Sequence, residues 1–92
     1  MKFEWDDEKA EANVKKHGVA FNEAKTVFRD PMYLIFADPD HSVDEKRFLV
    51  IGTSESDRLL FVSYTERQAA TRIISARKAT RRERKRYEEE DI

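Results

Sequence analysis

Apolar positions near the start of the chain recur at helical intervals. Ala10, Val14 and His17 are separated by four and three positions, so they share one narrow face of a helix. Asp6 can cap this helix, because its carboxylate can accept a hydrogen bond from an unpaired amide of the first turn. The pattern therefore predicts a helix over residues 6–16.

A second, shorter helix is expected directly after the first. Gly18 favours the left-handed conformation that ends a helix, and the apolar spacing resumes at Phe21. Asn22 can cap the second helix. Asp30-Pro31 should end it, since proline cannot continue a helix.

Beyond residue 31 the apolar residues alternate or run together as they do in strands. Four strands are predicted, over residues 32–36, 47–53, 58–65 and 71–78. Residues 37–46 are polar and are expected to form a loop. A last helix is expected from Arg81 to about Glu90, because Thr80 and Glu83 have the spacing of a capping box.

This order of elements predicts an α+β fold in a single domain that spans residues 1–92. The short connections favour antiparallel neighbours. Two helices would cover one face of a four-stranded antiparallel sheet and leave the other face for a ligand. A chain this short has room for one thin core, so a functional site is expected on a surface or in a shallow groove.

The net charge of −1 hides a strong asymmetry along the chain. Residues 67–86 hold nine basic side chains and one acidic side chain, which is half of all the cations. Such a cluster is typical of proteins that bind a phosphate backbone. A solvated helix balanced by the acidic residues 87–92 is an equally good interpretation of the charge alone.

Composition excludes several other kinds of chemistry. The chain has no cysteine, which removes disulfides, thiolate nucleophiles and thiolate metal sites. It shows no signal peptide and no apolar segment of membrane-spanning length, so a cytoplasmic location is expected. Residues 38–45 resemble the start of a calcium loop. Val43 and Leu49 stand where that loop needs glycine and glutamate, so neither a metal nor a cofactor is expected.

Three arginines are placed to hold a phosphate group. Arg67 follows the third predicted strand, and Arg72 and Arg77 lie in the fourth. Antiparallel pairing would bring Arg67 close to Arg72, and two guanidinium groups can grip a phosphate through paired hydrogen bonds. Strict alternation would point Arg72 and Arg77 to opposite faces of the sheet. For any single arginine, a surface ion pair remains the simpler interpretation.

Two side chains are candidates for moving protons during RNA cleavage. Histidine can accept or donate a proton at neutral pH, so His17 could take a proton from an attacking 2′-OH or give one to the leaving oxygen. Its place on the apolar stripe of the first helix is explained equally well by packing. Glu66, beside Arg67, is a second candidate base, although it could simply pair with that arginine.

Other residues are candidates for RNA contact without a part in the chemistry. Tyr64 and Tyr87 could stack on bases or could instead fill the core. The basic stretch from Lys78 to Arg86 could hold the phosphate backbone. The predicted RNA contacts are Lys16, Tyr64, Lys78, Arg81, Arg82 and Tyr87.

A set of short motifs extends along nearly the whole chain. They are Phe3-Glu4-Trp5-Asp6 with Lys9 and Asn13, Lys16-His17-Gly18-Val19 with Phe21 and Glu23-Ala24, Asp30-Pro31, Arg47-Phe48 with Ile51-Gly52, Thr65-Glu66-Arg67, and Arg72 to Arg77 with Glu83 and Tyr87. Each motif is weak alone, but together, in this order and at this spacing, they specifically resemble the BrnT toxin family.

The resemblance implies a metal-independent endoribonuclease toxin of a bacterial type II toxin–antitoxin system, with a RelE-like fold, that inhibits translation. It also implies a ribbon-helix-helix antitoxin of the BrnA type as partner, contact with DNA only through that antitoxin, and a toxin dimer as one arrangement of the complex. The catalytic neighbourhood that it implies contains His17, Glu66, Arg67, Arg72 and Arg77, without fixing which residue is base or acid.

Two other functions fit the same residues. A non-catalytic nucleic-acid-binding module, such as a co-repressor, would need the same cations. A protein-binding domain could dock its last helix on an acidic partner, but residues 81–86 offer no apolar face for that docking.

Overall fold

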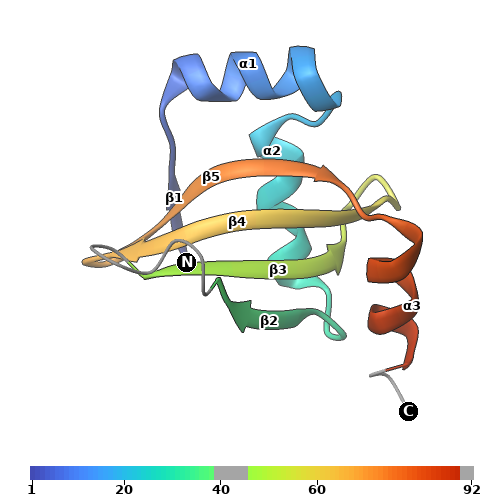
Figure 1. Ribbon diagram of the computed structural model, residues 1–92. Helices are drawn as coiled ribbons and strands as arrows, with labels where there is room; N and C mark the ends of the chain where they lie inside the picture. The colour runs from blue at the N-terminus through green and yellow to red at the C-terminus, as the bar shows by residue number, and fades with distance from the viewer. Residues whose placement is uncertain (39–45, 90–92) are drawn as a thin grey trace.

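The chain folds into a mixed five-stranded sheet with a helical layer on one side and a separate helix at one end (Figure 1). The computed structural model describes residues 1–38 and 46–89. The strands are β1 (Lys2–Glu4), β2 (Leu34–Ala37), β3 (Arg47–Thr53), β4 (Leu59–Arg67) and β5 (Ala70–Lys78). The helices are α1 (Asp7–His17), α2 (Phe21–Ala24), the 3₁₀ helix η1 (Lys25–Arg29) and α3 (Arg81–Glu89). None of the helices in the described ranges is long and apolar enough to cross a membrane.

The α+β class is confirmed, but the prediction of a four-stranded antiparallel sheet is wrong. The strand order is β1-β5-β4-β3-β2, and β1 is a fifth strand that runs parallel to β5. Residues 2–4 pair with residues 70–72. Three residues are too few to show a period, and their partner is distant in the sequence, so no local pattern predicts this strand. The other three pairings are antiparallel, as expected.

The predicted signals at the two ends of α1 are confirmed. Asp6 Oδ1 accepts hydrogen bonds from the amides of Glu8 and Lys9 at 2.8 and 3.1 Å. Gly18 follows the helix with a left-handed φ of 69°, and its amide donates to the carbonyl of Val14. Both ends of α1 are therefore set by local sequence.

The second helix differs from the prediction at its start. It begins at Phe21 after Ala20, which has no capping side chain, so Asn22 is not the cap. After one turn it continues as the 3₁₀ helix η1 and ends at Arg29, just before Asp30 as predicted. Tertiary packing of Phe21, which is 2% exposed, outweighs the capping preference of the next residue.

The remaining elements lie close to their predicted positions. β3 has the predicted bounds, and the other predicted strands are shifted by one or two residues at their ends. The capping box of α3 is confirmed, because the amide of Thr80 donates to Glu83 Oε1 at 2.9 Å and the amide of Glu83 donates to Thr80 Oγ1 at 3.2 Å. The predicted acidic loop lies mostly in residues 39–45, outside the described residues.

Helix α1 covers the part of the β5 edge that β1 leaves unpaired (Figure 1). Asn13, which is 6% exposed, makes the contact. Its Nδ2 donates to the carbonyls of Ala76 and Val19 at 2.8 Å each, and its Oδ1 accepts from the amide of Ala76 at 3.2 Å. Asn13 thus occupies backbone groups that would otherwise be open to pairing with another strand.

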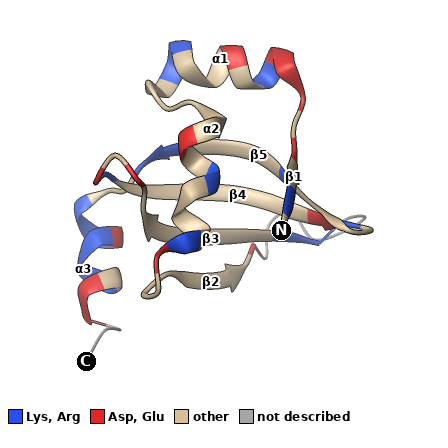
Figure 2. Cartoon of the chain, turned by 180° about the vertical axis from the view of Figure 1, so that it is seen from behind, with Lys and Arg blue, Asp and Glu red and all other residues tan. Residues whose placement is uncertain are grey.

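The core lies between the sheet and the layer formed by α2 and η1, which cross the sheet in Figure 2. Val50, Val62 and Ile73, from three neighbouring strands, point into this layer and are at most 1% exposed. η1 approaches β3 so closely that a Cβ on Gly52 would lie 3.0 Å from the carbonyl oxygen of Val27. We call the opposite side of the sheet the open face, and α3 lies at one end of it.

We expect Asn13→Ala to lower the free energy of unfolding by about 2–4 kcal/mol, because buried backbone groups would lose their partners. Urea unfolding followed by circular dichroism measures the change. The control is Glu11→Ala on the same helix, whose 73% exposed side chain makes a surface ion pair of little energetic weight. Equal small losses in the two variants would contradict the edge-capping role of Asn13.

Candidate nucleic-acid interface

Arginines from three adjacent strands meet on the open face around Thr65. Tyr64 points into the core, so Thr65, the next residue of β4, points to the open face. Arg47 of β3 and Arg72 of β5 are the register partners of Thr65, and residues directly opposite each other share a face. Arg67 is two residues further along β4 and so points to the same side. We call Arg47, Arg67 and Arg72 the arginine cluster.

The hydroxyl at the centre of the arginine cluster is unusual. Thr65 is 0% exposed, and its Oγ1 has no hydrogen-bond partner within the described part of the chain. A buried hydroxyl without a partner destabilises the fold, so it calls for a functional or structural reason. Thr65 lies between Arg47 and Arg72 in the pairing of the three strands, so its hydroxyl belongs to the same cluster.

A β-bulge places Arg72 and Arg77 on the same face, and the predicted strict alternation is wrong. Ser63 pairs with Ser75 whereas Tyr64 pairs with Ile73, so one residue of β5 has no partner on β4. The extra residue shifts the alternation by one position. Arg77 therefore points to the open face together with Arg72.

A carboxylate contacts the arginine cluster, and it belongs to Glu4. Glu4 is the register partner of Arg72, and its Oε2 lies 2.9 Å from Arg72 Nη1. Both side chains are partly exposed, at 39% for Glu4 and 28% for Arg72. Glu66 is one position from Thr65 and points to the helical side, where Thr71 Oγ1 donates to it at 3.3 Å. The glutamate that lies beside the arginines is therefore Glu4, and not the predicted Glu66.

Arg77 is engaged by α3. Its two terminal nitrogens donate to the two carboxylate oxygens of Glu83 at 2.8 and 2.9 Å, and its guanidinium carbon lies 4.2 Å from the ring centroid of Phe61. The hydrogen bonds to Glu83 raise the pKa of Arg77, so the side chain stays charged. The Glu83 carboxylate occupies the two guanidinium donors that a phosphate would bind. Arg77 therefore holds α3 in place and is not open to a ligand.

The rest of α3 is held by polar and aromatic contacts. Tyr87 Oη donates to Asp30 Oδ2 at 2.6 Å and lies 3.4 Å from Thr53 Oγ1. The guanidinium carbon of Arg86 lies 4.6 Å from the ring centroid of Phe36. None of the described residues of α3 is buried. Its exposed cations, coloured blue in Figure 2, include Arg81, Arg82, Arg84 and Lys85.

The other predicted site residues lie away from the arginine cluster. His17 is the half-buried last residue of α1, in the helical layer, and Lys16 is exposed beside it. Lys78 is the register partner of the core residue Leu60, so it too points to the helical side. The structure does not bring these three residues onto the face that carries the arginines, and their predicted roles stay predictions.

Tyr64 is a core residue, which corrects its prediction as a base-stacking contact. It is 3% exposed, with its ring centroid 5.1 Å from that of Phe28 and 5.5 Å from that of Phe48. Burial is the main cause that raises the pKa of Tyr64 to about 12. A ring that is almost completely buried has no face accessible to a nucleobase.

Sequence reasoning missed Arg47, Thr65 and Glu4 as members of this site. Arg47 and Thr65 could have been found from the register of the hairpin, because a turn centred on residues 54–58 pairs position 47 with position 65. Glu4 gave no such signal, since its place depends on a parallel pairing with β5.

The arrangement defines a class of protein. Arginines gathered on one face of a small α+β sheet, with more cations on an adjoining helix, are typical of proteins that bind nucleic-acid phosphates. A family model described as the ribonuclease toxin BrnT of a type II toxin–antitoxin system matches residues 5–83. The chain therefore belongs to the BrnT family of ribonuclease toxins, as its motifs predicted.

A solved structure has a similar fold. The crystal structure of the Brucella abortus ribonuclease toxin BrnT matches with a TM-score of 0.68 and 24% sequence identity, covering 88% of this chain and 99% of that chain. No curated protein matches the sequence significantly.

We expect Tyr87→Phe to weaken the docking of α3 and to change the acid stability of the protein. Burial acts to raise the pKa of Asp30, but hydrogen bonds from Tyr87 and from the amides of Thr53 and Met32 outweigh it and lower that pKa. A lowered carboxyl pKa stabilises the fold above the unfolded value of 3.8, and this contribution disappears as the pH falls through the folded pKa.

The Tyr87→Phe variant should therefore be about 1 kcal/mol less stable at pH 7 and should lose less stability between pH 5 and roughly 2. Thermal unfolding across this pH range measures both effects. Tyr33→Phe is the matched control, because Tyr33 is 41% exposed, and this variant should behave like the wild type. Identical pH profiles for the wild type and Tyr87→Phe would show that the Tyr87–Asp30 bond does not hold α3.

Proposed function

We propose that this chain is a metal-independent endoribonuclease toxin whose arginine cluster holds the scissile phosphate of RNA. The observation that carries the proposal is the grouping of Arg47, Arg67 and Arg72 around Thr65, whose hydroxyl has no hydrogen-bond partner among the described residues. Membership of the BrnT family supports ribonuclease activity in general. In this role the protein cleaves RNA in the cytoplasm, inhibits translation, and is neutralised by a BrnA-type antitoxin.

The chemistry needs a base, an acid and a place for negative charge. The 2′-oxygen of a ribose attacks the adjacent phosphorus and forms the fifth P–O bond, while the 2′-proton passes to a base. The bond to the 5′-oxygen then breaks, and that oxygen takes a proton. The products are a 2′,3′-cyclic phosphate and a 5′-hydroxyl. Guanidinium groups beside the phosphate stabilise the charge that develops on its equatorial oxygens.

Among the described residues, Glu4 is the carboxylate best placed to act as the base. It already touches Arg72, so a phosphate bound by that arginine would bring the neighbouring 2′-OH close to the Glu4 carboxylate. His17 and Glu66 lie on the helical side. An RNA bound by the arginine cluster would have to extend around the edge of the sheet to reach either of them. We keep His17 as the alternative proton carrier, to be separated from Glu4 by experiment.

We expect Arg72→Ala to lower the rate of RNA cleavage in the presence of EDTA by a factor of about 10²–10³. Arg47→Ala should also lower this rate. The measurement is cleavage of an end-labelled single-stranded RNA by purified protein. Arg29→Ala is the matched control, because Arg29 is an exposed arginine on the helical side. Full activity of Arg72→Ala would refute the proposed phosphate site.

The base is identified by the pH dependence of the rate. Glu4→Gln keeps a hydrogen-bond partner for Arg72 but cannot take a proton, so the rise of kcat with pH on the acidic side should disappear. In His17→Ala that rise should remain. The reverse result would assign the base to His17. If wild-type protein binds RNA but cleaves neither free RNA nor RNA on translating ribosomes, the chain is a non-catalytic nucleic-acid-binding module.

RNA binding should weaken steeply with salt if the exposed cations of α3 contact phosphates. Four contacts predict a loss of affinity of about 50-fold between 50 and 200 mM salt. A variant with glutamine at Arg81, Arg82, Arg84 and Lys85 should show a clearly flatter dependence. Filter binding with a nonhydrolysable 2′-deoxy substrate measures both proteins. Equal slopes would exclude α3 as an RNA contact.

A further inference from the structure

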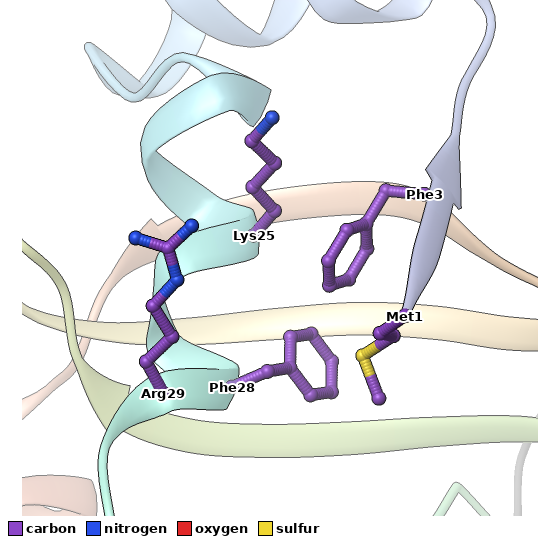
Figure 3. A pocket seen from close by; sticks show the side chains of 5 residues that line it. All are labelled: Met1, Phe3, Lys25, Phe28 and Arg29. Carbon is purple, nitrogen blue, oxygen red and sulfur yellow. The ribbon is translucent and has the colours of Figure 1, made fainter.

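A pocket of about 370 Å³ lies between η1 and the N-terminal residues of the chain (Figure 3). Phe3 and Phe28 line it, with ring centroids 5.4 Å apart, and Met1, which is 85% exposed, completes the apolar part. Lys25 and Arg29 lie one above the other on η1, which also carries Phe28, across the pocket from Met1 and Phe3 (Figure 3). The pocket therefore combines an apolar lining with two cations.

The two cations of the pocket, Lys25 and Arg29, have no ion-pair partner in the part of the chain that the structure describes. By contrast, Arg58, Arg72 and Arg77 each contact a glutamate. Two unpaired positive charges beside an apolar pocket favour a ligand that carries negative charge next to an apolar group.

Exposed apolar side chains continue from the pocket toward the outer edge of β2. The ring of Phe28 contacts that of Tyr33, with centroids 6.3 Å apart. Tyr33 and Ile35 are 41% and 43% exposed, and Ile35 lies on the helical side because its register partner is the core residue Val50. RNA is held through phosphates and ring stacking, to which an aliphatic side chain adds little. Contiguous exposed apolar groups are instead typical of protein interfaces.

We propose that this surface binds the protein antitoxin, through an acidic segment that places an apolar side chain in the pocket and carboxylates against Lys25 and Arg29. The partner class comes from membership of a toxin–antitoxin family, and the structure adds the surface. The inference rests on that part of the proposed function and not on RNA cleavage. The pocket and the arginine cluster lie on opposite sides of the sheet, so the two can be tested separately.

The test compares antitoxin affinity between two doubly substituted proteins of equal net charge. The pocket variant is Lys25→Glu/Arg29→Glu, and the control is Lys9→Glu/Lys15→Glu on the exposed side of α1. Isothermal titration with the cognate antitoxin should show at least tenfold weaker binding for the pocket variant and no change for the control. Ile35→Ser should also weaken antitoxin binding. Circular dichroism confirms that each variant is folded, and RNA cleavage should match the wild type in all of them.

Wild-type affinity in the pocket variant, or equal losses in the pocket variant and the control, would overturn the inference. A pocket variant that loses RNA affinity but keeps antitoxin affinity would show that the pocket binds RNA, which also overturns it. Failure of the catalytic proposal looks different, because the wild type would then cleave no RNA while its antitoxin affinity still depended on Lys25 and Arg29.

Discussion

One irregularity in the pairing of β4 with β5 determines which charged side chains share the open face. The bulge opposite Ser63 and Tyr64 gives β5 one residue more than its partner, and this residue reverses the alternation between Arg72 and Arg77. Without it, either Arg72 or Arg77 would point into the core. With it, Ile73 and Ala76 still fill the core while both arginines stay outside. This single backbone feature thus allows β5 to place apolar residues in the core and both arginines on the open face.

The sheet also separates two surfaces of different chemistry. On the open face the arginines are close to glutamates, as in the pairs of Arg72 with Glu4 and of Arg77 with Glu83, so a phosphate must compete for charges that are already partly neutralised. On the helical side the cations of η1 stand beside exposed apolar groups and have no such partners in the described ranges. The first surface suits a ligand that enters and leaves, and the second suits a partner that stays.

Features set by a few neighbouring residues could be predicted from the sequence. The caps of α1 and α3, the bounds of β3 and the closeness of Arg67 to Arg72 all follow from local spacing. Features set by distant contacts could not. The parallel strand β1 depends on β5, the bulge depends on two strands fitting a single core, and the burial of Tyr64 depends on rings from β3 and η1. The sequence consequently predicted Arg67 and Arg72 as members of the arginine cluster, but neither Arg47 nor the face that the three arginines share.

The way α3 is attached has a consequence for the dynamics of the molecule. A helix without a buried residue has little hydrophobic free energy to lose on detaching, so its amides should exchange with solvent through local opening long before the sheet unfolds. Each opening event would separate Arg77 from Glu83 and Arg86 from Phe36 at the same time. The cationic area of the open face is therefore not constant, and an anionic polymer that binds the opened form would draw the whole population toward it.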